Sequence, residues 1–208
     1  MTLFEDRQDA GTQLAAAVAD LNLEGAVTVV GLPRGGVPVA AAVAAALDAP
    51  LDVILVRKVG HPRHREYAIG AIAEGGVEIA NESEQRRLDP DEVASAVRRA
   101  RRELDERADL YRGARQRHAL AGRTVVVVDD GLATGATARS ALRAVRRIGA
   151  SKAILAVPVA SRRGLRSVEG VAHQVVCLHT PDDFRAVGQF YADFAPTTDD
   201  EVRAFLTD

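Results

Sequence analysis

The segment "VVVVDDGLATGAT", residues 125–137, combines three features of an α/β protein in a short space. Four consecutive valines indicate a strand that is buried on both faces, as the strands of parallel sheets are. Asp129 and Asp130 follow directly, and a loop of glycine and threonine then leads into a helix that begins near Thr137. Because open parallel sheets bind ligands at the carboxyl ends of their strands, this segment predicts both the fold class and a ligand site.

The rest of the chain repeats the alternation of strands and helices. Apolar runs predict strands at 26–31, 51–58, 123–129, 151–159 and 173–180. Helices are expected at 6–22, 37–49, 137–148 and 161–168. Residues 59–70 have no clear period and predict an exposed loop, and 71–81 predict a short hairpin around two glycines. We therefore expect an α/β fold, a parallel twisted sheet with helices on both faces.

A further helix is marked at both ends. Asp89 is the expected N-cap, Pro90 stands at the first helical position, and Glu92 stands at the third. An amphipathic stripe follows at spacings of three and four, and Gly113 is the expected end. The stripe consists of Val93, Val97, Ala100, Leu104, Ala108 and Tyr111.

The length and composition indicate one domain over residues 1–208. The tail 181–208 holds four of the five phenylalanines, so we expect it to form a small C-terminal cap, alone or together with 1–22. The sequence contains no run near the ~20 apolar residues of a membrane span, and its first residues are unlike a signal peptide, so we expect a cytoplasmic protein. A net charge of −2 argues against a general nucleic-acid binder. The single cysteine excludes an internal disulfide and a cysteine-cluster metal site.

The loop after Asp130 has the composition of a phosphate cup. Gly131 and Gly135 allow successive N–H groups to turn inward, Thr134 and Thr137 add hydroxyl donors, and the helix directs its positive end to the same place. The loop lacks the Gly-Lys-Ser/Thr ending of a Walker A loop. Carboxylates beside such a cup suit the hydroxyls of a ribose, and they would stabilise positive charge that develops on the sugar ring. Taken singly, Asp-Asp-Gly is also a common turn and Thr a common helix cap.

The segment 125–137 resembles the phosphoribosyl pyrophosphate (PRPP) binding motif of the type I phosphoribosyltransferases, and a weaker resemblance covers about 26–180. The overall likeness is to the bacterial "predicted phosphoribosyltransferase" group, whose acceptor is not settled. The resemblance implies an enzyme of nucleotide metabolism that uses PRPP and Mg²⁺ and transfers ribose 5-phosphate to a nucleobase-like acceptor. It also implies a homodimer without nucleic-acid or membrane partners.

Residue roles follow from the resemblance. Asp129 and Asp130 would hold the ribose and, through water or ribose hydroxyls, the metal. The 5-phosphate would bind at Ala133, Thr134, Gly135, Ala136 and Thr137. "LPRGG", residues 32–36, stands where the family binds pyrophosphate, often with a non-proline cis peptide. Arg34 and Lys58 would act in catalysis beside the two aspartates, and the pyrophosphate contacts would be Arg34, Gly35, Gly36, Arg57 and Lys58.

The family also has a mobile basic loop that closes over the site, and "RKVGHPRHREY", residues 57–67, matches it in place and composition. Its further members are His61, Arg63, His64 and Arg65. A solvated run of charges is the alternative. Lys58 weakens that alternative, because only Lys58 and Lys152 are lysine among 27 basic residues.

The acceptor is not identified by the sequence. Ala133 stands where the hypoxanthine-guanine branch has an additional Asp, and the uracil branch's C-terminal signature is absent. Phe184 is a candidate for stacking on a base, and an ordinary core role is equally compatible with it. No residue indicates the general base for the acceptor.

Two other functions compete with an enzyme. A PRPP- or nucleotide-sensing regulator would keep the phosphate cup but could lose the chemistry of the basic loop. A relative of PRPP synthase would need an ATP site and about one further domain, more than we expect 208 residues to provide. Because the basic loop is present and the net charge is slightly negative, the enzyme is favoured.

Overall fold

The computed structural model describes residues 2–64, 67–113 and 115–207. Its main sheet is parallel and has the strand order β2-β1-β6-β7-β8. The strands are β1 (Val27–Gly31), β2 (Leu51–Val53), β6 (Thr124–Val128), β7 (Lys152–Val159) and β8 (Gln174–His179). The four valines 125–128 are fully buried in the central strand β6. The predicted parallel sheet is thereby confirmed.

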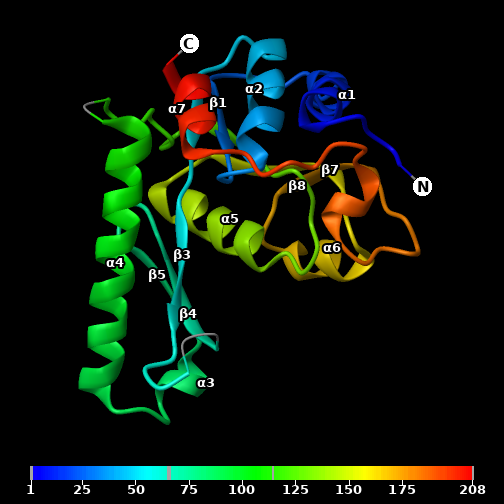
Figure 1. The fold of residues 1–208 in the computed structure, drawn as a ribbon. Helices are drawn as coiled ribbons and strands as arrows, with labels where there is room; N and C mark the ends of the chain where they lie inside the picture. The colour runs from blue at the N-terminus through cyan, green and yellow to red at the C-terminus, as the bar shows by residue number, and fades with distance from the viewer. Residues whose placement is uncertain (1, 65–66, 114, 208) are drawn as a thin grey trace.

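Helices cover both faces of this sheet (Figure 1). Helices α1 (Arg7–Ala19) and α2 (Gly36–Ala46) pack on one face through small and branched side chains such as Leu14, Val39 and Val43. Helices α5 (Ala136–Ile148) and α6 (Arg162–Val168) pack on the other face, where Leu142 and Val145 meet Leu155. The two layers of apolar side chains form the core, as expected for a parallel sheet.

A second sheet was not predicted. Strands β3 (Val56–Gly60), β4 (Ala68–Ala73) and β5 (Val77–Ala80) form an antiparallel sheet, and the short helix α3 (Glu82–Gln85) follows it. Helix α4 (Pro90–Arg112) packs along this sheet through Ala96 and Ala100, which contact Val59, Ile69 and Ile72. Figure 1 shows β3–β5, α3 and α4 extending together from the main body, and we refer to residues 56–112 as the arm.

Two sequence predictions need correction here. The single strand expected at 51–58 is two strands, β2 and β3, which belong to different sheets. The exposed loop expected at 59–70 is shorter, because β3 continues to Gly60 and β4 begins at Ala68. The apolar run "LDVILV" continues through both strands, so no local signal marks the point where the chain leaves one sheet for the other. The hairpin around Gly75 and Gly76 is confirmed, and both glycines have positive φ angles.

The predicted ends of α4 are confirmed. The Asp89 carboxylate accepts hydrogen bonds from the N–H groups of Asp91 and Glu92, Pro90 is the first helical residue, and Gly113 is the C-cap. Near its last turn, Arg112 forms a buried ion cluster with Asp52 of β2 and with Glu74, which follows β4. The Arg112 Nε lies 2.8 Å from Asp52 Oδ1. This cluster, which we call the ion triad, joins the arm to the main sheet.

The C-terminal segment packs on the N-terminus. Phe4 bridges to Tyr191, and the rings of Phe184, Phe190 and Phe194 extend one aromatic cluster around them. A 3₁₀ turn, η1 (Val187–Phe190), lies within this segment, and helix α7 (Asp199–Thr207) contacts α2 and α4. Whether 181–208 acts as a cap over a ligand remains a prediction. None of the helices in the described ranges is long and apolar enough to span a membrane.

Candidate functional site

The sheet has a topological switch point between β1 and β6. These strands are neighbours, but the chain leaves β1 through α2 toward β2 on one side and leaves β6 through α5 toward β7 on the other. Loops at such a point diverge and leave a crevice at the carboxyl ends of the strands. Residues 32–36 and residues 129–135, the two segments that the sequence singled out, follow β1 and β6 at this point, and we call the space beside them the crevice.

Two glycines allow the 32–36 loop to lie directly against the aspartates. A Cβ at position 35 would stand 2.0 Å from Asp130 Oδ2, and a Cβ at position 36 would stand 2.9 Å from the Asp129 Cα. Any side chain there would push the loop and the acidic pair apart. The Pro33–Arg34 peptide bond is cis, in agreement with the family resemblance.

The two aspartates have different surroundings. The Asp130 carboxylate accepts a hydrogen bond from Arg7 Nε at 2.9 Å, and the exposed fractions of the two side chains are only 15% and 12%. The Asp129 carboxylate accepts from the N–H of Asp130 and forms no ion pair with a described residue. Burial and the neighbouring charge of Asp130 raise the pKa of Asp129 well above its ordinary value. Burial also raises the pKa of Asp130, although Arg7 opposes that shift. Asp129 is therefore the carboxylate that gains most from a cationic ligand.

Sequence reasoning missed the residues that hold Asp130. Arg7 reaches it from α1, its guanidinium carbon lies 3.9 Å from the centre of the Phe194 ring, and its Nη1 donates to the Ala195 carbonyl oxygen. The Tyr191 hydroxyl donates to the Asp130 carbonyl oxygen at 2.6 Å. The clustering of phenylalanines in the tail was a partial signal, but nothing in the sequence linked Arg7 to a residue 123 positions away.

Removal of the Arg7 charge should change how the acidic pair titrates. With Arg7→Gln we expect the pKa of Asp130 to rise further, because the guanidinium opposes the effect of burial. Carboxylate titration followed by NMR should show this shift. An unchanged Asp130 titration in a folded Arg7→Gln variant would contradict the assigned role, and Arg162→Gln, which loses an exposed pair with Asp182, is the matched control.

The loop 133–137 has the geometry of an anion cup. Helix α5 begins at Ala136, its N-cap Gly135 has a φ of 74°, and Ala133, Thr134, Ala136 and Thr137 are all exposed. Within the described residues, the N–H groups of Ala133, Thr134 and Gly135 have no backbone acceptor. Gly135 is also required by packing, since a Cβ there would stand 2.0 Å from Ser167 Oγ. Free N–H groups at the start of a long helix are a suitable site for a phosphate.

Arg34 lies in the loop 32–36, but its guanidinium lies near Asp199, the first residue of helix α7. Its Nη1 is 3.9 Å from Asp199 Oδ1. Asp199 also accepts hydrogen bonds from Arg107 and from the Tyr111 hydroxyl, at 2.9 and 2.6 Å. The hydrogen bond from Tyr111, followed by that from Arg107, lowers the pKa of Asp199, so this carboxylate is charged near neutral pH. The Arg34 side chain is 45% exposed, so its guanidinium is accessible from solvent.

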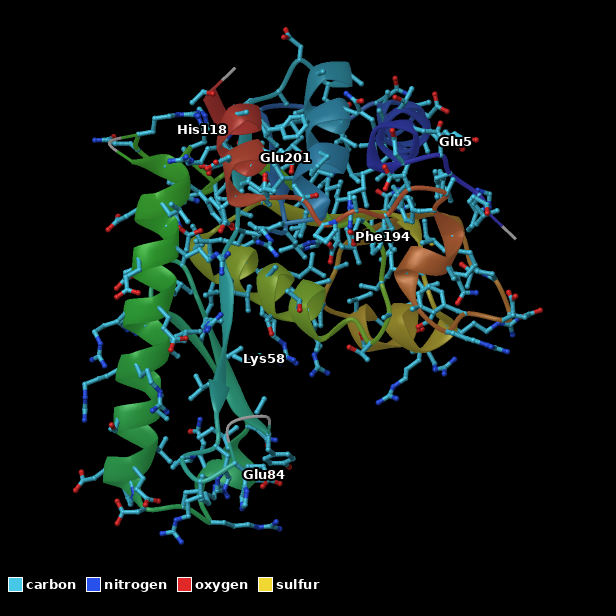
Figure 2. The ribbon with its side chains drawn as sticks, in the orientation of Figure 1. Glu5, Lys58, Glu84, His118, Phe194 and Glu201 are labelled. Atoms are coloured by element: carbon cyan, nitrogen blue, oxygen red, sulfur yellow. The ribbon has the colours of Figure 1, made fainter. Side chains whose placement is uncertain are left out.

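Lys58 lies on strand β3 of the arm, not in a loop (Figure 2). It is exposed and lines a cavity of about 910 Å³ together with Arg57, Pro33, Ala136 and Thr137. The cavity therefore brings the predicted catalytic lysine, the loop after β1 and the start of α5 to one space. We call this space the arm groove, since β3, β4, α4 and α5 form its walls.

The other residues of the predicted basic loop lie farther along the arm. The rings of His61 and His64 are 5.3 Å apart, and Arg63 pairs with Glu92 at 3.3 Å. Arg65 lies outside the described residues. The arm groove is not lined by His61, Arg63 or His64, so the structure does not bring these three to the crevice.

Phe184 belongs to the aromatic cluster of the tail. Its ring is 5.3 Å from that of Phe190, and the side chain is partly buried. The role of Phe184 in stacking on a base remains a prediction.

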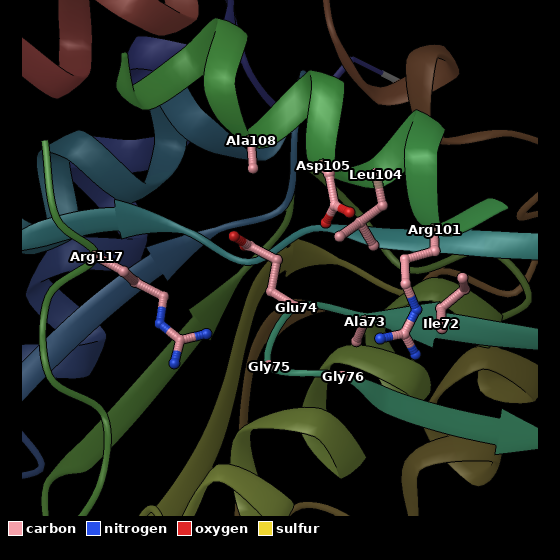
Figure 3. Close-up of a pocket in the computed structure, with 10 residues that line it drawn as sticks. All are labelled: Ile72, Ala73, Glu74, Gly75, Gly76, Arg101, Leu104, Asp105, Ala108 and Arg117. Carbon is pink, nitrogen blue, oxygen red and sulfur yellow. The ribbon is translucent and has the colours of Figure 1, made fainter. Parts of the chain in front are cut away.

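A smaller cavity on the arm contains none of the predicted site residues. It has a volume of about 370 Å³, and Figure 3 shows Arg101 and Arg117 on either side of the Gly75–Gly76 turn that forms part of its wall. Of the two carboxylates that line it, Glu74 and Asp105, Glu74 is already bound by Arg112. The crevice and the arm groove are therefore the stronger candidate site.

Comparisons with known proteins agree with this geometry. Residues 4–195 match the family model of the phosphoribosyl transferase domain. Two Mycobacterium tuberculosis proteins, from strains H37Rv and CDC 1551, are named provisionally as phosphoribosyl transferases, and each is 50% identical over 99% of this chain. The chain spans about half the length of these curated relatives, 47%.

Solved structures share the fold. The crystal structure of TT1426 from Thermus thermophilus is 46% identical, with a TM-score of 0.87 over 99% of this chain and 98% of that one. A hypothetical protein from Neisseria gonorrhoeae with bound ppGpp is 11% identical, with a TM-score of 0.52 over 100% and 96% of the two chains, and shows likeness of fold alone. The switch-point crevice, the matched family model and the identity to its relatives lead to one conclusion: the chain belongs to the phosphoribosyltransferase family.

Proposed function

We propose that the protein transfers ribose 5-phosphate from PRPP to a ring nitrogen of a nucleobase-like acceptor and releases pyrophosphate. The observation that carries this proposal is the contact of the 32–36 loop with Asp129 and Asp130, beside the cup at the start of α5. The cup, the two aspartates and the 32–36 loop would then receive the 5-phosphate, the ribose and the pyrophosphate of PRPP, in that order.

The chain supplies distinct groups for each step. The cup would hold the 5-phosphate, and the aspartates would accept hydrogen bonds from the ribose hydroxyls. As the bond from the anomeric carbon to the pyrophosphate oxygen breaks, the electron pair leaves with pyrophosphate, and positive charge develops on the ring. The two carboxylates would stabilise that charge, and Arg34 and Lys58 would offset the charge on the leaving group. The lone pair of the acceptor nitrogen then forms the new bond to the anomeric carbon, and the proton of that nitrogen is released to solvent.

The donor set fits a magnesium ion that arrives with the substrate. The described residues include no group of three or more His, Cys, Asp or Glu side chains that could hold a metal ion. Asp129, which has no cationic partner among them, would share the ion with PRPP, because Mg²⁺ usually binds one or two carboxylates plus substrate phosphates. When bound, magnesium would supply neutralisation of the pyrophosphate charge.

A nucleobase screen tests the function directly. The protein, PRPP and Mg²⁺ would be mixed with each of a panel of nucleobases, and the release of pyrophosphate would be measured. We expect release that depends on one acceptor class and is lost without Mg²⁺. Tight PRPP binding with no release for any acceptor would instead support the second candidate function, a PRPP-sensing regulator.

Lys58 separates the enzyme from the regulator. Loss of one well-placed electrostatic group in an active site lowers the rate on the order of a hundredfold, so Lys58→Ala should lower kcat by about that factor and change PRPP affinity only modestly. Lys58→Arg should restore activity only in part, since a planar guanidinium places its charge differently. Steady-state kinetics with an accepted base provide the measurement. Full activity in Lys58→Ala would show that Lys58 is only a solvated charge.

A further inference from the structure

Three donor groups converge on one oxygen of the Asp199 carboxylate, at the start of helix α7. Asp199 Oδ1 accepts hydrogen bonds from Arg107 Nη2 at 2.9 Å and from the Tyr111 hydroxyl at 2.6 Å. Arg34 Nη1 lies 3.9 Å from the same oxygen. Arg107 and Tyr111 belong to α4, whereas Arg34 belongs to the 32–36 loop, so two distant segments of the chain supply these donors. Charge-assisted donors that meet at one point bind carboxylate and phosphate oxygens equally well.

All three donor residues line a cavity of about 410 Å³ beside the 32–36 loop. The polar side chains of its wall are Arg34, Arg57, Glu103, Arg107, Tyr111 and Thr137. Glu103 is paired with Arg57, whose Nε lies 2.8 Å from Glu103 Oε2. Arg34 and Arg57 are two of the predicted pyrophosphate contacts. The cavity therefore extends the proposed pyrophosphate site toward α4, where Arg107 and Tyr111 have no assigned role.

Helix α7 does not need Asp199 for its own start or for its packing. Thr198 caps the helix, because its Oγ1 accepts a hydrogen bond from the Glu201 N–H at 3.1 Å and its own N–H donates to the Glu201 carboxylate at 2.6 Å. Val202 and Leu206 hold the helix through apolar contacts with α2 and α4. Docking of α7 therefore does not account for the position of the Asp199 carboxylate among the three donors.

We propose that Arg34, Arg107 and the Tyr111 hydroxyl bind the pyrophosphate group of PRPP, and that the Asp199 carboxylate occupies their site until pyrophosphate displaces it. This inference rests on the proposed function. Pyrophosphate carries more negative charge than a carboxylate and offers more acceptor oxygens, and a guanidinium binds phosphate through two hydrogen bonds. Pyrophosphate therefore replaces Asp199, but it binds less tightly than it would if the site were empty.

The carboxylate also keeps the site in order while no ligand is bound. Arg34 and Arg107 carry like charges, which repel each other when no anion lies between them. The Tyr111 side chain is buried, so its hydroxyl needs a hydrogen-bond partner. With Asp199 in place, pyrophosphate meets donors that are already positioned. The displaced carboxylate can be hydrated, because the Asp199 side chain is partly exposed.

Pyrophosphate itself tests the competition. The full chain would be titrated by calorimetry with pyrophosphate in the presence of Mg²⁺. Asp199→Asn keeps the size of the side chain and an oxygen that can accept the hydrogen bond from Tyr111, but it removes the competing charge. Pyrophosphate should then bind about fivefold more tightly. A purely structural role of Asp199 would instead leave the affinity unchanged or lower it, and either result would overturn the proposal.

The next residue of α7 provides the matched control. Asp200 is exposed and pairs with Arg203, so Asp200→Asn removes the same charge from the same helical turn. Because an exposed charge is screened by salt, this variant should change the affinity for pyrophosphate by less than about twofold. An equal gain in the Asp199 and Asp200 variants would indicate only long-range repulsion and would overturn the proposal.

Variants of α4 locate the bound pyrophosphate. Arg107→Gln should weaken its binding about tenfold, because one charge-assisted donor is lost. Arg102→Gln removes the same charge from an exposed position of α4 outside the cavity and should change the affinity by less than about twofold. Equal losses in these two variants would overturn the role of Arg107. Should Arg107→Gln not fold, Tyr111→Phe, which removes only the hydroxyl, should still weaken pyrophosphate about threefold, and an unchanged affinity there would count against the site.

A titration with ribose 5-phosphate separates this inference from the proposed function. The cup at 133–137 should bind ribose 5-phosphate with the same affinity in the original chain and in Asp199→Asn. If neither ribose 5-phosphate nor pyrophosphate binds, the proposed function fails. If both bind but Asp199→Asn gives no gain for pyrophosphate, only the competition by Asp199 fails. The two failures are therefore distinguishable.

Discussion

Replacing Asp129 and Asp130 together by asparagine should abolish phosphoribosyl transfer, with a fall in kcat/KM on the order of a thousandfold or more. Asparagine keeps the size of each side chain but removes the charge that would stabilise the developing positive ring and bind magnesium. The N–H groups of its amides would also face the hydroxyl donors of the ribose. Steady-state kinetics and PRPP calorimetry would measure the two effects.

Asp182→Asn is the matched control. Asp182 is an exposed aspartate that pairs with Arg162, and its loss should leave kcat/KM unchanged. Unchanged PRPP affinity in the folded Asp129/Asp130 variant would contradict the assignment of the ribose site.

The same pair predicts a pH dependence. Burial raises the pKa of Asp129, and the charge of Asp130 raises it further. Because the charged form is the one that would bind magnesium and ribose, PRPP affinity should fall as the pH decreases through this raised pKa, above the range where an exposed aspartate titrates. A PRPP affinity that stays constant down to the ordinary range would show that Asp129 is not the titrating group.

Arg112→Ala should lower the free energy of unfolding by about 3–5 kcal/mol, the usual cost of removing one partner from a buried ion pair. Arg112 exposes 9% of its side chain, and Asp52 and Glu74 expose 5% and 8%. Its Nη2 also donates to the Val53 carbonyl oxygen at 2.7 Å. Two buried carboxylates would lose their cation, and the arm would lose its polar connection to β2.

Denaturant unfolding measures this loss. Arg102→Ala removes an exposed arginine from the same helix and should change stability by no more than about 0.5 kcal/mol. If Arg112→Ala also lowered the free energy of unfolding by no more than about 0.5 kcal/mol, water would have to enter the site and replace the guanidinium. Simultaneous replacement of Arg112, Asp52 and Glu74 by apolar residues should cost less than Arg112→Ala alone, since no charge is then left buried.

The sequence alone determined the parts of this protein that depend on local patterns. Continuous apolar runs identified the buried strands β6 and β7, and a stripe at helical spacing with a cap at each end identified α4. The acidic pair and the cup at 129–137 were also predictable, because one strand, one loop and one helix start contain all of these groups.

Only the tertiary structure decided which distant groups share the site. The antiparallel sheet depends on pairs such as Arg57 with Ile72, and its strand β4, "AIGAIA", is rich in alanine and glycine, which favour strands weakly. Sequence reasoning therefore placed Lys58 at the end of a predicted strand, 51–58, and within the predicted basic loop 57–67, whereas pairing with Ala71 of β4 holds it inside β3.

The contact of Arg7 with Asp130 and the position of α4 beside α5 around the arm groove also depend on packing. Arg7 and Asp130 are separated by 123 residues. Residues of α4 and α5 line one groove although β6 lies between these helices in the sequence. Helix and strand propensity and hydrophobic periodicity depend only on residues that are close together in the sequence. Contacts of this range arise only when separate elements pack, and it is packing that placed the arm beside the start of α5 and Arg7 beside Asp130.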